Sequence, residues 1–105
     1  TEEEISPAEL VEMRNSGIDF QLIDVREPHE FAIDNLGAEL MPLARLGNFV
    51  DKISQDKIVV IHCQSGMRSQ KAIQQLKEKY GFANLKNLTG GIVAFRNGFG
   101  EKKCK

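Results

Sequence analysis

The sequence contains no apolar run that approaches the roughly 20 residues needed to cross a bilayer. Its beginning, Thr1-Glu2-Glu3-Glu4, is acidic, whereas a signal peptide begins with positive charge. It has two cysteines, Cys63 and Cys104, which are too few to build a disulfide framework. We therefore expect a soluble, cytoplasmic protein that has no membrane partner and works where thiols stay reduced.

The sequence also lacks an excess of charge of either sign. Its 14 basic and 15 acidic residues are dispersed and give a net charge of -1, so we expect no nucleic-acid partner. Neither His29 nor His62 lies at a metal-ligand spacing from a cysteine, so we expect no metal site. There are no repeats, low-complexity tracts or internal linkers. A chain of 105 residues forms one domain, which we place at residues 1–105.

What the sequence does contain is a cysteine between a buried strand and a helix. Residues 58–61 are four consecutive β-branched apolar residues, which is typical of a parallel strand buried on both faces. A helical pattern follows from Ser69. Between them, Gly66 allows backbone N–H groups to converge, and the helix N-terminus adds positive potential at the same point. The pattern predicts an anion site with Cys63 at its mouth.

The size of the pKa shift that would make Cys63 reactive indicates which groups must stabilise its thiolate. Lowering a thiol pKa from about 8.5 to about 6.5 takes about 2.7 kcal/mol, whereas a helix N-terminus supplies about 0.3 to 1 kcal/mol. The loop amides and the Arg68 guanidinium must therefore supply the remainder. The alternative is that Cys63 is a small buried apolar residue with no chemistry.

The remaining elements alternate between helices and strands. Ser6, Pro7 and Glu9 form a capping-box pattern that begins a helix reaching about Asn15. The other expected elements are strands at 20–25, 38–41 and 85–88, a short helix from Pro28, a helical apolar face over 43–53, and a helix over 69–80 ended by Gly81. This order predicts an α/β fold with a parallel sheet and Cys63 at the end of its central strand.

Asp24 stands at the carboxyl end of the first long strand, the edge where open α/β sheets hold their ligands. It can equally be a turn or N-cap residue without chemistry, because Pro28 and Glu30 indicate a short helix just beyond it. His29 fits a solvated helix residue. The glycine pair in the turn at 89–91 permits positive φ or a close approach of backbone, or it is an ordinary helix start.

Three blocks of the sequence resemble the rhodanese-like sulfurtransferases. They are Cys63-Gln64-Ser65-Gly66-Met67-Arg68-Ser69, residues 22–27 followed by Glu30-Phe31, and residues 88–92, in the family's order. More narrowly, residues 62–66 and 35–38 resemble the domain fused behind E1-like adenylyltransferases of molybdopterin and thiamine sulfur pathways. The resemblance implies a single rhodanese-like α/β domain with a five-stranded, mainly parallel sheet in the order 1-5-4-2-3, flanked by helices on both faces.

The resemblance also implies roles for individual residues. Cys63 would be the catalytic nucleophile that carries sulfane sulfur as a persulfide, and no cofactor is needed. Its substrate-binding loop would be Gln64, Ser65, Gly66, Met67, Arg68 and Ser69, with Arg68 placing an anionic donor. Asp24 would accept hydrogen bonds that brace the loop, and Arg26 would pair with Glu30 in support.

The expected partners are a sulfur donor, either thiosulfate or a desulfurase persulfide, and a thiophilic acceptor. Rhodaneses that use thiosulfate well commonly carry an Arg directly after the cysteine, and the neutral Gln64 favours a persulfide donor. In adenylyltransferase-linked relatives the acceptor is the C-terminal glycine of a ubiquitin-like sulfur carrier, activated by the adenylyltransferase domain.

Two other readings stay open. The first is a cysteine-dependent phosphatase, whose signature Cys-x5-Arg would need an arginine where Ser69 stands. The second is a noncatalytic or redox-sensing rhodanese-like module with Cys104 as a resolving thiol.

Overall fold

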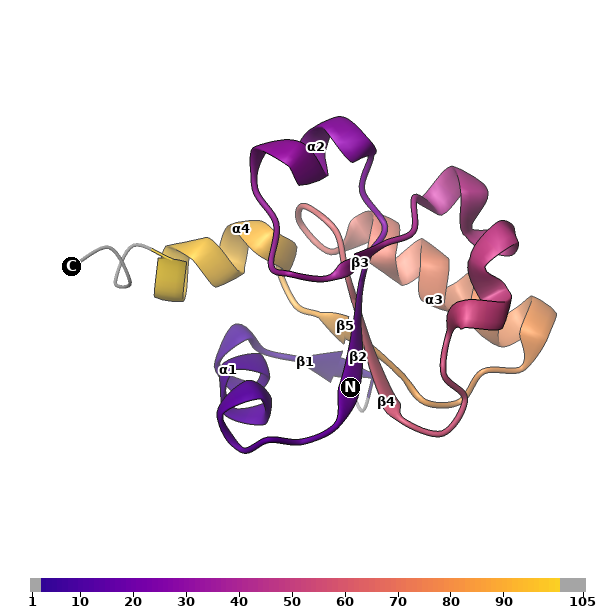
Figure 1. The fold of residues 1–105 in the computed structure, drawn as a ribbon, viewed down its shortest axis with the longest axis horizontal. Helices are drawn as coiled ribbons and strands as arrows, with labels where there is room; N and C mark the ends of the chain where they lie inside the picture. Colours follow the sequence, from indigo (N-terminus) through magenta and orange to yellow (C-terminus); the bar gives the residue numbers. More distant parts are fainter. Residues whose placement is uncertain (1–2, 101–105) are drawn as a thin grey trace.

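The computed structural model describes residues 3–100, which form a five-stranded sheet with helices on both faces (Figure 1). The strands are β1 (Glu4–Ile5), β2 (Phe20–Asp24), β3 (Glu39–Leu40), β4 (Ile58–His62) and β5 (Leu85–Leu88). Their order is β1-β5-β4-β2-β3, and every neighbouring pair is parallel. The expected fold class and strand order are confirmed.

The helices begin and end largely where the sequence signals lie. They are α1 (Pro7–Asn15), α2 (Pro28–Ile33), the 3-10 helix η1 (Leu43–Lys52), α3 (Met67–Tyr80), α4 (Gly91–Phe95) and the π-helical segment η2 (Arg96–Gly100). The capping box of α1 is confirmed, because the Glu9 amide donates to Ser6 Oγ and the Ser6 amide donates to Glu9 Oε1. Gly81, with a φ of +74°, ends α3.

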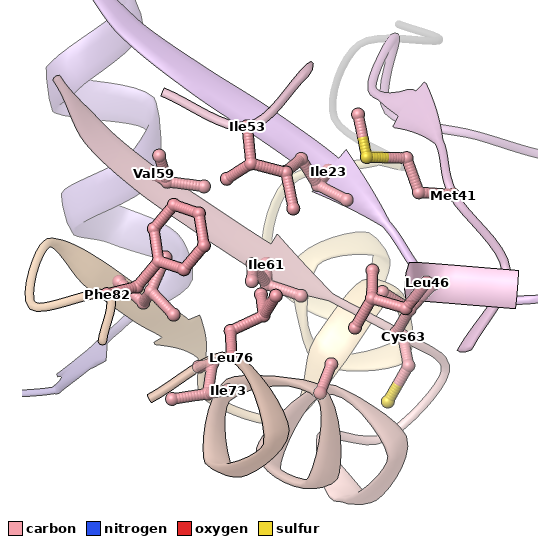
Figure 2. Packing of buried hydrophobic residues seen from close by; sticks show 13 residues of the cluster. Ile23, Met41, Leu46, Ile53, Val59, Ile61, Cys63, Ile73, Leu76 and Phe82 are labelled. Carbon is pink, nitrogen blue, oxygen red and sulfur yellow. The ribbon is translucent and has the colours of Figure 1, made fainter. Parts of the chain in front are cut away.

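Two hydrophobic clusters occupy the two faces of the sheet. Val59 and Ile61 of β4 belong to the cluster that includes residues of α3 and η1 (Figure 2). Val60 belongs to the other cluster, together with Leu10 of α1 and Ile92 of α4. Side chains alternate between the faces of a strand, so β4 is buried on both sides, as its run of β-branched residues predicts.

Several element boundaries differ from the expectations. The strand expected at 20–25 ends at Asp24, the strand expected at 38–41 is only Glu39–Leu40, and α3 begins at Met67 rather than Ser69. The apolar segment after Pro42 is a 3-10 helix. β1 was not assigned from its residues, because two residues are too few to show a strand periodicity. Within residues 3–100, no helix has the length and apolar character needed to cross a membrane.

The cysteine loop lies at the carboxyl edge of the sheet. β2 and β4 pair along their whole length, from Phe20–Ile58 to Asp24–His62, so both end at the same edge. Cys63 follows β4 directly, and α2 follows β2 across the same edge. Open α/β sheets hold their ligands in this position.

Candidate active site

Cys63 is held by its main chain and leaves its sulfur facing the start of α3. The Cys63 and Gln64 carbonyls accept hydrogen bonds from the amides of Ile92 (3.0 Å) and Val93 (3.1 Å) in α4. The residue is 1% exposed and lies at one end of the apolar cluster, where its sulfur points toward α3 (Figure 2). The Gly66 amide donates a hydrogen bond of 3.0 Å to Sγ.

Gly66 gives the loop the turn that brings this amide to the sulfur. Its φ is +109°, a value that L side chains rarely adopt, and it is the N-cap residue of α3. A Cβ at this position would also lie 3.5 Å from the Gly90 nitrogen. Glycine is therefore required by backbone conformation, and it sets the N-terminus of α3 beside the sulfur.

The surroundings of the sulfur favour its thiolate form. Burial alone would raise the pKa of the Cys63 thiol, but hydrogen bonds from the Ser69 hydroxyl and from nearby amides outweigh burial and lower that pKa. The amides are those of Ser69, Gly66 and Ser65. The Ser69 hydroxyl lies 3.5 Å from Sγ. A thiol whose pKa is lowered by surrounding hydrogen-bond donors is typical of a reactive cysteine.

Arg68 directs its hydrogen bonds to α2. Its Nη1 and Nη2 atoms donate to Glu30 Oε2 (2.8 Å) and Oε1 (2.9 Å), which is a bidentate pair. The hydrogen bond from Arg68 lowers the pKa of Glu30 to about 2, and the same bond raises the pKa of Arg68. The positive charge of Arg68 favours the Cys63 thiolate, but two of its five N–H donors are bonded to Glu30, whose negative charge compensates it.

The supporting residues are paired differently from the expectation. Arg26 binds Asp24, through Nη2 (2.9 Å) and Nε (3.1 Å), and the expected Arg26–Glu30 pair is wrong. Asp24 and Arg26 are 0% and 3% exposed, and a buried carboxylate requires a buried partner charge. Glu30 is taken by Arg68. Among the described residues, Asp24 accepts hydrogen bonds from Arg26 and from no residue of the loop, so the expectation that it accepts hydrogen bonds bracing the loop is also wrong.

A buried histidine lies near both Asp24 and the Cys63 main chain. His62 is 0% exposed; its Nδ1 lies 3.2 Å from the Cys63 carbonyl oxygen, and its Nε2 lies 3.7 Å from Asp24 Oδ2. Burial is the largest influence and lowers the pKa of His62 despite the nearby carboxylate. The lowered pKa favours the neutral ring, whose nitrogens lie near the Cys63 carbonyl and the Asp24 carboxylate.

The loop residues divide into a buried inner set and an exposed rim. Gly66 and Ser69 are buried against the sulfur, Gln64 and Ser65 are exposed, and Met67 is 71% exposed. A groove of about 490 Å³ runs beside the loop between α2 and α4. Its lining includes Gln64, Glu30, Ile33, Val93, Arg96 and Asn97.

The sequence does not identify two residues that lie near the sulfur or its loop. Asn87 of β5 is 2% exposed, and its Oδ1 accepts a hydrogen bond from the Ser69 hydroxyl. The sequence feature that could have identified Asn87 is a polar residue within a buried strand. Gly91 lies against the loop, because a Cβ there would be 2.4 Å from the Gln64 carbonyl oxygen. That close approach was one of the two readings of the 89–91 turn. Cys104 lies outside the described residues.

Comparisons with known proteins agree with this geometry. The family model described as Rhodanese-like domain matches residues 6–98. The Mycobacterium tuberculosis protein named probable adenylyltransferase/sulfurtransferase MoeZ is 42% identical over 94 residues, which is 87% of this chain and 24% of MoeZ. The thiosulfate sulfurtransferase GlpE of Pseudoalteromonas translucida is 29% identical, covering 93% of this chain and 92% of GlpE.

A solved structure gives the same result. The crystal structure of a rhodanese-like domain protein from Staphylococcus aureus superposes with a TM-score of 0.81 at 28% identity, over 89% of this chain and 90% of that chain. The narrower resemblance to a domain fused to adenylyltransferases is also confirmed, although the chain spans about a quarter of the length of MoeZ. Because the family model matches residues 6–98, and the parallel sheet holds the cysteine loop at its carboxyl edge, the chain belongs to the rhodanese-like family.

Proposed function

We propose that this protein is a sulfurtransferase that carries sulfane sulfur as a persulfide on Cys63. The observation that carries the proposal is the surroundings of the sulfur, where the Gly66 amide donates at 3.0 Å and the Ser69 hydroxyl lies at 3.5 Å. These groups lower the pKa of the thiol, and the thiolate is the nucleophilic form of cysteine.

The proposed reaction has two displacements at sulfur. In the first, the Cys63 thiolate attacks the sulfane sulfur of the donor, a new S–S bond forms, and the bond between that sulfur and the rest of the donor breaks. The donor leaves with the electron pair, as sulfite when the donor is thiosulfate. In the second, a thiophilic acceptor attacks the outer sulfur, and the Cys63 thiolate leaves. The loop amides hold the negative charge on sulfur at each stage.

The charges around the loop favour a persulfide on another protein as the donor. Gln64 is neutral and exposed, and Arg68 is paired with Glu30. The groove beside the loop also contains Arg96, whose guanidinium is paired with Asp34. A small dianion such as thiosulfate therefore meets guanidinium groups whose positive charge is already compensated by a carboxylate, whereas a protein persulfide is placed by surface contacts.

For the acceptor, we propose a ubiquitin-like sulfur carrier whose C-terminal glycine is activated by an adenylyltransferase domain. The support is the similarity to MoeZ, which is named as both an adenylyltransferase and a sulfurtransferase. The route would be molybdopterin or thiamine biosynthesis or another thiolation. A working thiolate requires a reducing compartment, so the proposal includes the cytoplasm.

Mass spectrometry of the intact protein tests the proposal. The Cys104→Ser variant is treated with thiosulfate or with a persulfidated cysteine desulfurase, freed of donor, and weighed before and after addition of a thiol acceptor. We expect the protein to gain the mass of one sulfur atom and to lose it to the acceptor.

The matched control is the Cys63→Ala, Cys104→Ser double variant, which should gain nothing. If no persulfide donor adds sulfur to Cys63, the sulfurtransferase proposal is wrong. The redox-sensing reading would then be favoured by an internal Cys63–Cys104 disulfide forming in the unsubstituted protein under peroxide.

A further inference from the structure

The Ser69 hydroxyl, which favours the thiolate, has a single proton and more than one acceptor within reach. Its Oγ lies 3.5 Å from Cys63 Sγ and 3.1 Å from the Gly66 carbonyl oxygen, and it makes a still shorter contact with Asn87 Oδ1. A serine hydroxyl can donate only one hydrogen bond at a time. The Gly66 carbonyl also accepts the Gln70 amide at 3.2 Å, but its oxygen has a second lone pair. Gly66, Asn87 and Cys63 therefore all compete for the proton, and Asn87 makes the shortest contact.

The orientation of the Asn87 side chain is fixed on its other side by Glu4. Asn87 Nδ2 donates to both carboxylate oxygens of Glu4, at 3.1 and 3.3 Å, and lies 3.5 Å from the Gly66 carbonyl oxygen. Turning the amide over would place Oδ1 against the Glu4 carboxylate, acceptor against acceptor. Glu4 is in turn held by the Thr89 hydroxyl at 2.8 Å. Because Nδ2 donates to the Glu4 carboxylate, Asn87 presents its oxygen to Ser69.

We propose that Asn87, oriented by Glu4, is a positioning residue that competes with the Cys63 sulfur for the hydroxyl proton of Ser69. In the thiol form the bonds run in one direction: S–H donates to Ser69 Oγ, and the hydroxyl donates to Asn87 Oδ1. When the thiol loses its proton to solvent, the hydroxyl turns to the sulfur. Ser69 Oγ and Asn87 Oδ1 then face each other without a proton, unless the amide turns over and gives up Glu4.

This competition raises the pKa of the Cys63 thiol, whose ionised form the proposed function requires. The biological meaning of the proposal therefore rests on that function. Glu4 lies in β1, Asn87 in β5 and Ser69 in α3. The arrangement lets a residue at the far side of β5 influence the cysteine loop through two side chains, without touching the substrate.

Three other charged side chains of α3 bind partners other than Asn87. Arg68 of α3 is paired with Glu30 of α2. Lys77 of α3, which lines the same groove of about 380 Å³ as Glu4 and Asn87, is paired with Glu3. Glu78 also lines this groove, and its carboxylate accepts a hydrogen bond from Gln74. Glu4 is therefore the carboxylate that binds Asn87.

The test measures the ionisation of Cys63 directly, by the pH dependence of its alkylation rate in the Cys104→Ser background. Asn87→Leu removes the competing oxygen at similar volume and unchanged charge, and Glu4→Gln allows the Asn87 amide to turn over. We expect each to lower the alkylation midpoint by about half to one pH unit, as for the net contribution of one ordinary hydrogen bond. Glu78→Gln, in the same groove, should leave the midpoint unchanged.

A double-mutant cycle separates the hydrogen-bond chain from simple electrostatics. In a Ser69→Ala background, the effects of Asn87→Leu and Glu4→Gln should disappear, because the chain passes through the hydroxyl. A Glu4→Gln shift that persists without Ser69 would mean a direct charge effect and would overturn the proposal. So would a raised or unchanged midpoint in Asn87→Leu. If Asn87→Leu fails to fold, the Glu4→Gln cycle decides alone.

The two proposals can fail separately. Alkylation requires no sulfur donor, so a lowered midpoint without any sulfur adduct would overturn only the sulfurtransferase function. An adduct on Cys63 with an unchanged midpoint in both variants would overturn only the role of Asn87.

Discussion

Replacing Gly91 by alanine should disturb the cysteine loop from outside it. Gly91 has a φ of +62°, and a Cβ there would lie 2.4 Å from the Gln64 carbonyl oxygen and 2.6 Å from the Cys63 carbonyl oxygen. These are backbone atoms of the loop, and they also accept the amides of Ile92 and Val93. The added methyl group cannot be accommodated by a side-chain rotation, so either the loop or α4 must move.

The expected loss of stability has two parts. An alanine in a left-handed conformation costs about 1 to 2 kcal/mol, and forcing an extra methyl group into a packed site costs about 1 to 3 kcal/mol. Gly91→Ala should therefore lower the free energy of unfolding by about 2 to 5 kcal/mol. Gly17→Ala is the matched control, because Gly17 has a φ of +73° and a Cβ there meets nothing within 4 Å. It should lose only the first part.

Urea unfolding of the two variants gives the comparison, and alkylation of Cys63 reports whether the loop has moved. Gly90→Ala provides a further control, because its Cβ would strike the Ala94 side chain at 2.5 Å and not the loop. We expect altered Cys63 reactivity in Gly91→Ala alone. Equal stability losses in Gly91→Ala and Gly17→Ala, with unchanged reactivity at Cys63, would refute the reasoning.

Other predictions concern the ion pair of the loop, the start of α1 and the core. Glu30→Gln should free Arg68 and raise the rate of sulfur transfer from thiosulfate several-fold, and an unchanged rate would exclude Glu30 as the restraint. Arg68 lowers the pKa of Glu30 from 4.5 to about 2, so the pair stabilises the fold by about 1 kcal/mol above about pH 4.5. This stabilisation is lost as the pH falls toward 2. The free energy of unfolding of Glu30→Gln should therefore not decrease through this contribution between pH 4.5 and 2. Ser6→Ala should lower the free energy of unfolding by about 1 kcal/mol, because the Ser6 cap of α1 is lost, with Ser16→Ala as a control expected to be neutral. Leu76→Ala should lower it by about 2 to 5 kcal/mol, because Leu76 is 0% exposed, and a loss under 1 kcal/mol would contradict its place in the core.

The features that the sequence predicts correctly depend on local chemistry. The capping box needs only Ser6 and Glu9, three residues apart. The buried strand β4 follows from consecutive β-branched residues, and the turn at Gly66 that brings an amide to the sulfur follows from a glycine between β4 and α3. The strand order came from resemblance to a family, since β1 has only two residues and no periodicity of its own.

The features that the sequence does not predict are long-range choices of partner. Arg68 and Glu30 are 38 residues apart. By charge alone, Glu30 could equally pair with Arg26, and Arg68 with Asp24. The structure pairs Arg26 with Asp24 because both are buried at the end of β2. Asn87 was missed for the same reason, because its contact with Ser69 depends on β5 lying beside β4.

The most direct test of the central claim is the pKa of Cys63 in the folded protein. The alkylation rate of the Cys104→Ser variant is measured against pH, in buffer and in concentrated urea. The hydrogen bonds from Ser69 and the loop amides predict a midpoint at lower pH in the folded protein than in the unfolded chain. A midpoint in the folded protein equal to or above that of the unfolded chain would mean that burial outweighs the hydrogen bonds to the sulfur. That result would contradict the account of Cys63 as an activated nucleophile.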